Sequence, residues 1–379
     1  MSETRSADSL VVETADPRDL ERLAAAWDDL SARAAEPNAF ADRAFLAPAL
    51  ARLAPRRVAV LFVWGDAARE KLVGVAAIAL PRVPVGLARF WFSEQAGLPA
   101  LALDRDAAAP ALGAIVAWLR RDRRRLSGLA LQAVDPEGPV AAAAGELAAR
   151  ESLPLAKGNP RRRAALPVGP DCDFEAGLDA RRRRRSTRQR RRLAELGRLE
   201  ASALEGAPGI EAFLALERQG WKGARGSALV LDPARAAFAR EMLAGFAARG
   251  ALRVHSLALD GAPIAIGVAL VSGDRGFYWK IAYDERFAKY SPGAQLTLDL
   301  SRRLQREPGL TLIDSCAAPG HPMVDPLWRG RINLVDLALA IRPDSERAFA
   351  AALAVDSARR SLRELAKRAL APWRRRLRF

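Results

Sequence analysis

Apolar residues recur along this chain with two different periods, and the alternation between them predicts a mixed α/β fold. Runs in which every second residue is apolar indicate strands, whereas apolar residues three and four apart indicate helices. Asp16-Pro17 suits the start of the first helix. In the first 150 residues the pattern predicts strands at 10–14, 58–64, 72–80 and 129–134, and helices at 16–30, 107–125 and 138–150.

The same rhythm of elements returns after a turn-rich segment at 157–160. Asp260-Gly261 is a strong signal for a two-residue hairpin. No residue-level repeat is visible, so two tandem units are inferred from the order of elements, with limits at 1–157 and 161–342 and a tail at 343–379. The second unit is expected to contain helices at 174–196, 210–219, 234–249 and 292–306, and strands at 198–203, 252–259, 264–272, 276–283, 310–314 and 334–341.

Length and composition agree with two globular units. At 379 residues the chain exceeds what one hydrophobic core usually serves, and half of its residues are apolar. Cys172 and Cys316 are too few and too isolated for a disulfide framework or a zinc site. Residues 1–8 do not resemble a signal peptide, and the longest apolar run, 262–271, is too short to span a bilayer. We therefore expect a cytoplasmic protein without a metal centre.

The net charge of +16 is concentrated in two segments. Arg181–Arg192 contains nine arginines and no acid, and residues 359–379 contain nine basic residues and one acid, so the rest of the chain is nearly neutral. The arginine run is either a solvated helix face or a surface for an anionic ligand, and mutual repulsion of nine cations favours the ligand. No aromatic residue interrupts the run, so a nucleic-acid partner is not expected from stacking.

The C-terminal tail has the pattern of a helix that lies at a membrane surface. Its apolar residues recur on one helical face, and basic residues occupy the rest. A tail of this kind predicts contact with the anionic surface of the inner membrane. The apolar face comprises Leu362, Leu365, Ala366, Ala369 and Leu370.

The segment from the strand at 276–283 to the following helix predicts an anion site. Ser291 is a good N-cap, Pro292 suits the first helical position, and Gly293 would let a ligand approach the backbone closely. Free amides at a helix start, together with the helix dipole, bind phosphate groups. The alternative is an ordinary capped helix.

Several segments together resemble one bacterial family. The set is similar to the GNAT-like acetyltransferases associated with cellulose and exopolysaccharide biosynthesis, and more distantly to the Fem-type aminoacyl transferases of peptidoglycan assembly. The resemblance covers roughly residues 160–342, and the first third of the chain more loosely. The segments are Leu216-Glu217, Gly220–Gly223, Tyr283–Gly293, Ile313–Ala317 and Leu327-Trp328.

This resemblance implies a tandem GNAT-like acyl-CoA N-acyltransferase fold with a basic C-terminal helical tail. It implies acetyl-CoA or another acyl-CoA as donor, and an amine or hydroxyl of a cell-envelope or exopolysaccharide precursor as acceptor. Trp221, Lys222 and Gly223 are expected on the acceptor side. The donor-binding residues are expected to be Lys280, Lys289, Tyr290, Ser291, Pro292, Gly293, Ala294 and Gln295.

Four residues are candidates for the proton transfers of acyl transfer. Asp314 follows an apolar strand at an edge where ligands gather, and Asp284 precedes the helix start. His321 is one of only two histidines, and Tyr283 is placed to protonate a leaving thiolate, as a tyrosine does in many GNAT enzymes. Each also has a structural interpretation: Asp314 as a cap of the next turn, and Tyr283 as a half-buried core aromatic.

Other enzyme classes have no support in the sequence. It contains no Ser-His-Asp order, no Walker loop and no dinucleotide fingerprint, which argues against hydrolases, kinases and dehydrogenases. Two alternatives remain on the same fold. One is a Fem-like transferase that uses aminoacyl-tRNA, in which the arginine run would contact RNA. The other is a non-catalytic scaffold in polysaccharide biosynthesis.

Overall fold

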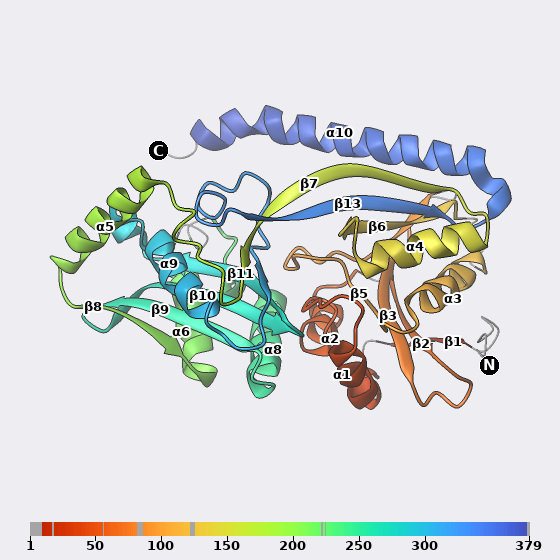
Figure 1. Cartoon of the computed structure of the whole chain (residues 1–379), viewed down its shortest axis with the longest axis horizontal. Coiled ribbons are helices and arrows are strands. Elements are labelled where there is room, and N and C mark those ends of the chain that lie inside the picture. The colour runs from red at the N-terminus through yellow and green to blue at the C-terminus, as the bar shows by residue number, and fades with distance from the viewer. Residues whose placement is uncertain are drawn as a thin grey trace.

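The fold is built on one continuous mixed sheet that runs the length of the molecule (Figure 1). Its strand order is β1-β2-β3-β4-β6-β13-β7-β12-β11-β10-β9-β8, and β5 pairs with β3 at the side. The computed structural model describes residues 10–16, 19–55, 57–81, 86–121, 126–220, 223 and 225–376; for residues 363, 364 and 367–376 it describes the backbone alone.

The N-terminal unit contains the strands and helices up to β7. Its strands are β1 (Val11–Thr14), β2 (Val58–Trp64), β3 (Leu72–Ala79), β4 (Leu87–Phe90), β5 (Leu101–Leu103), β6 (Gly128–Val134) and β7 (Leu155–Pro167). Its helices are the short 3₁₀ helix η2 (Leu20–Leu23), α1 (Ala24–Ala32), α2 (Arg43–Arg52), α3 (Ala108–Arg120) and α4 (Pro139–Arg150).

The C-terminal unit repeats that order and ends in a long helix. Its strands are β8 (Leu199–Leu204), β9 (Leu252–Leu259), β10 (Ala262–Ser272), β11 (Arg275–Tyr283), β12 (Leu312–Asp314) and β13 (Gly330–Ala340). Its helices are α5 (Ala180–Ala194), α6 (Gly206–Gln219), η3 (Leu229–Leu231), α8 (Pro233–Ala248), η4 (Glu285–Tyr290), α9 (Pro292–Leu304), η5 (Pro343–Ser345) and α10 (Glu346–Arg376).

The topology confirms the tandem arrangement expected from the sequence. In each unit, antiparallel strands are followed by a helix. The strand after that helix lies parallel to one of the strands before it. In the first unit β4 and β6 are the parallel pair, on either side of α3 in the chain. In the second unit β11 and β12 are the parallel pair, on either side of α9.

The two units exchange their last strands. β13, from the C-terminal unit, pairs with β6 of the first unit, while β7, from the N-terminal unit, pairs with β12 of the second. β7 and β13 also pair with each other over most of their length, so they join the two halves into a single sheet. A backbone hydrogen-bonded junction of this kind resists independent movement of the units more than a flexible linker would.

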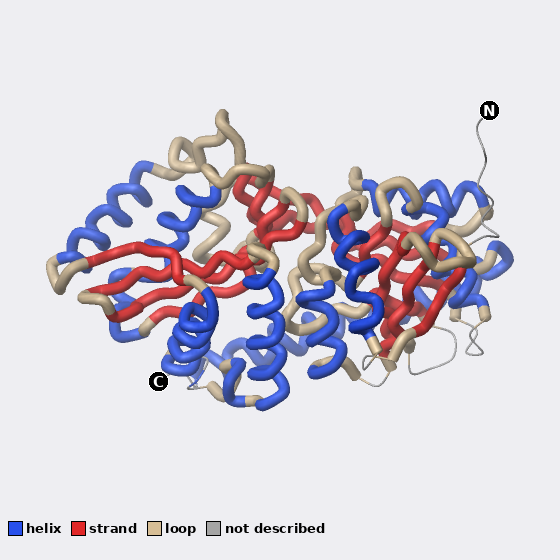
Figure 2. Tube along the Cα trace, turned by 90° about the horizontal axis from the view of Figure 1, so that it is seen from below, coloured by secondary structure: helices blue, strands red, loops and turns tan. Residues whose placement is uncertain are grey.

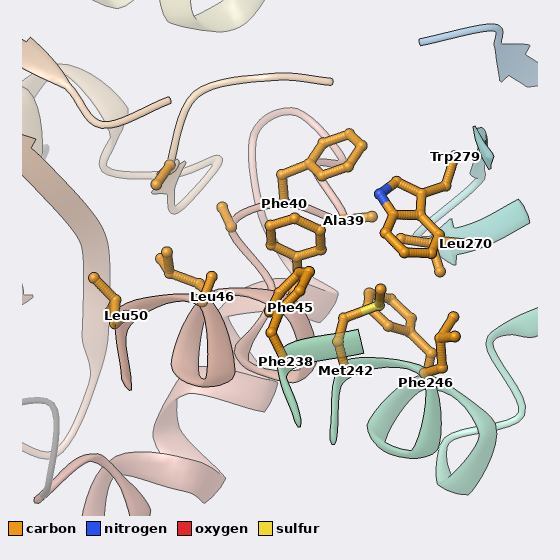
Figure 3. Packing of buried hydrophobic residues seen from close by; sticks show 14 of the residues in the cluster. Ala39, Phe40, Phe45, Leu46, Leu50, Phe238, Met242, Phe246, Leu270 and Trp279 are labelled. Atoms are coloured by element: carbon orange, nitrogen blue, oxygen red, sulfur yellow. The ribbon is translucent and has the colours of Figure 1, made fainter. Parts of the chain in front are cut away.

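A shared hydrophobic core strengthens this junction. α2 of the first unit packs against α8 of the second, and the rings of Phe45 and Phe238 meet edge to face with centroids 5.3 Å apart (Figure 3). Phe40 similarly meets Phe277 at 5.4 Å. These aromatic side chains are almost completely buried, so the helices cover one side of the sheet as one layer across both units.

Helices cover the sheet on its other side as well (Figure 2). In the first unit, α3 and α4 pack on the side opposite α1 and α2, because alternate residues of β2 and β3 point to opposite faces and both sets are apolar. In the second unit α9 occupies the equivalent place opposite α6 and α8. The three-layer α/β class and the GNAT-like order are as expected.

Three local expectations from the sequence were wrong or incomplete. The turn expected at 157–160 lies inside β7, where Asn159 takes the left-handed conformation and the strand continues. α2, β4 and β5 were not anticipated. The arginine helix begins at Ala180 rather than at Phe174, because the Asp179 side chain accepts a hydrogen bond from the Arg181 amide and caps it there. The proposed domain limits stay a prediction, since β7 itself crosses between the units.

The C-terminal tail is helical, as expected. α10 extends from Glu346 to Arg376 along one long side of the molecule (Figure 1). Within the part of the chain that the structure describes, no helix has the length and apolar character needed to cross a membrane.

Candidate functional site

The start of α9 has the free amides that an anion site requires. Ser291 takes the left-handed conformation (φ 55°, ψ 53°), which turns the chain sharply from η4 into the helix. The Gln295 amide donates to the Ser291 carbonyl, 3.1 Å away. Among the residues that the structure describes, no hydrogen-bond acceptor meets the amides of Gly293 and Ala294. Two donors therefore remain at the positive end of a 13-residue helix.

The arginine helix α5 docks directly beside this turn. Ser186 and Gln295 exchange two hydrogen bonds, from the Ser186 hydroxyl to Oε1 and from Nε2 to the Ser186 carbonyl, at 3.2 and 3.0 Å. The Gln189 side chain donates to the Ser291 hydroxyl and to the Lys289 carbonyl, both at 3.1 Å. The turn is therefore held in place by neutral side chains of a strongly basic helix.

Most of the cations on α5 are free to meet a ligand. Arg190 pairs with Asp299 of α9 at 2.8 Å, and Arg191 pairs loosely with Glu195 at 3.8 Å. The other arginines are exposed and form no ion pair within the described part of the chain; they are Arg181, Arg182, Arg183, Arg184, Arg185, Arg188 and Arg192. A row of unpaired cations next to free helix amides is electrostatically suited to phosphate groups.

The equivalent turn of the N-terminal unit contains a buried ion-pair cluster. α3 follows Asp104, which is fully buried and pairs with Arg33 and Lys71, and its carboxylate also accepts from the Asp106 amide. The Arg33 and Lys71 cations offset the charge of Asp104, so this carboxylate has a structural role in the fold.

The sheet opens beside α9. β11 pairs with β12 only from Arg275 to Phe277, because β12 ends at Asp314. From Tyr278 to Tyr283 the register pairs β11 with β10 alone. Two hydrogen bonds lie nearby: the Trp328 indole donates to the Ser301 hydroxyl at 2.8 Å, and the Tyr278 hydroxyl lies 3.1 Å from that of Thr297. The loop that follows β12 thus lies against α9.

Gly293 is buried but not crowded by the protein. A Cβ atom there would lie 3.4 Å from a carbon of Ile281, 3.5 Å from Tyr283 and 3.7 Å from the Met323 sulphur, which are ordinary contacts. Two cavities lie elsewhere in the described part of the chain. The larger, about 650 Å³, lies near the other end of α9, between Val168, Phe174 and Arg306, and the smaller lies beneath α10.

Asp314 is a buried ion-pair partner. It is 3% exposed, it accepts a hydrogen bond from the Arg163 guanidinium, and its other oxygen accepts from the Cys316 amide at 2.8 Å. Burial raises the pKa of this carboxyl, while the Arg163 cation opposes the shift. Arg163 also donates to the Gly97 carbonyl. The pair therefore connects β12 of the C-terminal unit to β7 and to the Gly97 segment of the N-terminal unit. Asp314 caps the following turn through the Cys316 amide, and its catalytic role stays a prediction.

Asp284 caps η4. Its carboxylate accepts from the backbone and guanidinium of Arg286, and this contact holds its pKa below the usual range despite partial burial. A carboxylate with a lowered pKa is a weaker general base. Tyr283 packs with Leu296 and Phe287 beside the turn. His321 accepts on Nδ1 from the amides of Met323 and Val324, both at 3.4 Å, in the loop that covers α9.

The remaining predicted residues fall into two groups. Lys289 is exposed and its ammonium lies 4.9 Å from the centre of the Tyr290 ring; Lys280 stacks on Trp279 at 5.1 Å. These residues and Ser291–Gln295 lie together along β11 and the turn. Trp221 and Lys222 are outside the described residues. Gly223 is described, and a Cβ there would collide with the Arg218 carbonyl at 1.7 Å, so it is a structural glycine.

Sequence reasoning missed the contacts that connect α5 to α9, and it missed Arg163. The docked face of α5 could have been found, because Ser186, Gln189 and Leu193 recur at helical spacing within the arginine run. Arg163 could not have been found by spacing, because it follows two other arginines on β7 and only the fold shows which of the three is buried.

Comparisons with known proteins agree with this geometry. Residues 180–320 match the model of the acetyltransferase (GNAT) domain. The C-terminal unit has the fold of a GNAT acetyltransferase domain. The matched range begins with α5 and includes β11, the Ser291 turn, α9 and β12. A search of curated proteins found no match.

Solved structures extend the likeness to both units. FemX matches with a TM-score of 0.53 and 10% identity, over 86% of this chain and 96% of its own. L-PGS from Bacillus licheniformis matches with a TM-score of 0.53 and 11% identity, over 90% of this chain and 97% of its own. At such low identity the likeness shows the fold alone. It supports the expected similarity to Fem-type proteins, and the chain has a GNAT-type acyltransferase fold.

Proposed function

We propose that this protein transfers an acyl group from acyl-CoA to an amine or hydroxyl, and that the start of α9 holds the donor's diphosphate. The observation that carries the proposal is the pair of unmatched amides at Gly293 and Ala294 beside seven unpaired arginines of α5. Backbone amides would bind phosphate oxygens, and the guanidinium groups would neutralise the remaining charge.

The open edge of β11 suits the rest of the donor. From Tyr278 to Tyr283 its main chain pairs on one side only, so the other edge could hydrogen-bond the amides of an extended pantetheine arm. The acyl carbon would then lie near the end of β12. The acceptor nitrogen or oxygen attacks this carbon, the carbon–sulphur bond breaks, and the departing thiolate takes up a proton.

The proposed acceptor is a precursor of the cell envelope or of an exopolysaccharide, bound at the junction of the units. The family resemblance supports the acceptor class. A segment of the first unit reaches the second beside this junction. The Trp279 indole donates to the Gln95 carbonyl at 2.7 Å, and Arg235 pairs with Glu94 at 2.8 Å. Tyr283, His321 and Asp314 remain the candidates for proton transfer, and the reaction would take place in the cytoplasm.

A thermal-shift titration tests donor binding. Acetyl-CoA or a longer acyl-CoA at about a hundred times its Kd should stabilise the fold by about 2.7 kcal/mol. An S-acetyl pantetheine fragment, which has the same thioester without the diphosphate, should stabilise it far less at equal concentration. If no acyl-CoA raises the melting temperature, or if the fragment raises it as much as acyl-CoA does, the donor site is wrongly assigned.

A second candidate keeps the fold and changes the donor to aminoacyl-tRNA. The unpaired arginines of α5 are the specific observation that favours it, and the likeness to FemX over both units agrees. Binding of RNA to about five arginines should weaken steeply with salt, with a log–log slope near −4. Filter binding of tRNA at 50 and 200 mM salt checks this, and no binding at low salt would eliminate the candidate.

A further inference from the structure

The first half of α10 is firmly packed. Phe349 and Ala352 are buried at 4% and 7% exposure, in a small apolar cluster with Leu87, Ala130 and Ala338 of the sheet. This cluster covers the face of the N-terminal unit that faces away from α3 and α4. The helix is therefore part of the fold at its beginning.

An ionic network fastens α10 up to its middle. Asp356 accepts from Arg89 of β4 and pairs with Arg360 at 3.1 Å. Arg360 also approaches Asp336 of β13, 3.6 Å away, and Asp336 pairs in turn with Arg161 of β7 at 2.8 Å. The network thus fastens the middle of α10 to β4 and β13.

Beyond Arg360 the described apolar side chains of the helix are uncovered. The side chains of Leu362 and Leu365 are 65% and 59% exposed, more than any other large apolar residue described. Val355, 50% exposed, lies seven residues before Leu362 and so begins the same stripe. In the sequence Ala369 and Trp373 continue it at helical spacing. Beyond Arg360 the structure describes the side chains of residues 361, 362, 365 and 366, and all four are exposed.

The charge of this segment indicates what covers the face. Residues 359–379 contain nine basic residues and one acid, so another copy of the segment would bring like charges together. A helix with an apolar stripe, a basic polar face and an aromatic residue near its end is typical of helices that lie in the interface of an anionic bilayer.

We propose that the second half of α10 docks on an anionic membrane surface, with the stripe from Val355 through Leu362 and Leu365 toward the acyl chains and the arginines at the head groups. In both views the end of the helix lies at the same end of the long axis as the C-terminal unit (Figures 1 and 2). Docking would therefore hold the donor-binding unit near the membrane. This interaction is independent of the donor that the protein uses.

Vesicle co-sedimentation of the full-length protein tests the proposal. Vesicles of phosphatidylcholine with one-third phosphatidylglycerol should retain the protein, whereas pure phosphatidylcholine should retain at least tenfold less, because each basic residue near the surface contributes to binding. The double variant Leu362→Asp/Leu365→Asp should reduce retention at least tenfold. Leu231→Asp, which changes an apolar side chain 45% exposed on η3, serves as the matched control and should bind as the parent does.

Three outcomes would overturn the proposal. One is equal binding to neutral and anionic vesicles, and another is unchanged binding by Leu362→Asp/Leu365→Asp. The third is a concentration-dependent dimer in sedimentation velocity that this variant abolishes, without vesicle binding by the parent; the stripe would then be an interface between copies. Melting curves of the variants should match the parent, since neither leucine is packed, so a loss of binding cannot be attributed to unfolding.

Discussion

Replacing Arg163 by methionine is expected to lower the free energy of unfolding by about 3–5 kcal/mol, because it leaves a buried carboxylate without its cation. Arg163 and Asp314 have side chains that are 8% and 3% exposed. Methionine keeps the apolar stem of the arginine but cannot donate to Asp314 or to the Gly97 carbonyl. Urea unfolding at pH 7.5 measures the loss.

Two controls isolate the buried pair. Arg162→Met alters the neighbouring arginine on β7, which is exposed, and should cost less than about 0.5 kcal/mol. Arg163→Met/Asp314→Asn removes the stranded charge and should recover part of the loss, since a neutral amide is less costly to bury than a carboxylate. A loss below 1 kcal/mol for Arg163→Met would show that the pair does not hold the two units together.

The second large effect concerns Asp42 and pH. This carboxyl, 3% exposed at the start of α2, lies where the first unit meets the second. Burial raises its pKa from 3.8 to about 6, and the Arg249 cation of the second unit only partly opposes the shift. Between these two pKa values the folded state holds a proton that the unfolded state has lost. The protonated carboxyl therefore contributes its full stabilisation below pH 4. Its contribution to the free energy of unfolding falls by about 3 kcal/mol as the pH rises to about 6.

Asp42→Asn removes that pH dependence. The free energy of unfolding of the variant minus that of the parent should increase by about 3 kcal/mol between pH 4 and pH 7. Taking the difference cancels groups common to both proteins, including buried His255, whose pKa burial lowers to about 4. A difference that stays constant over this range would mean that Asp42 is ionised in the fold at its ordinary pKa.

The fold was predictable from local pattern wherever strands and helices are amphipathic or uniformly buried. The hairpin of β9 and β10, the strand β11 and the helix α9 were placed within two residues, because turn signals, alternation and a proline at N1 act over short distances. The strand exchange was not predictable. β7 carries three consecutive arginines and a Gly-Asn-Pro sequence, and it becomes a strand because β13 pairs with most of its length and β12 with its last three residues.

The candidate site was likewise predictable only where its features depend on neighbouring residues in the sequence. The helix start at Pro292 could be predicted from residue type, but the capping expected of Ser291 was wrong: its side chain caps no amide and accepts a hydrogen bond from Gln189 instead. Its surroundings depend on tertiary contacts: Gln189 reaches Ser291 from a helix about a hundred residues earlier in the chain, and Asp284, expected as a base, is instead neutralised by the adjacent Arg286. Residue type thus predicted the helix start but not the partners that set its electrostatics.

The central claim is that the first turn of α9 binds the diphosphate of an acyl-CoA, and isothermal titration with acetyl-CoA of Ala294→Glu against Ala294→Gln tests it most directly. Ala294 is partly exposed, and a glutamate in the first turn should stabilise the helix, so the fold is preserved. A carboxylate a few ångströms from two phosphates should weaken binding at least tenfold, whereas glutamine, equal in size, should stay within about threefold of the parent. If the glutamate variant binds acetyl-CoA as tightly as the glutamine variant, the donor does not bind at this turn.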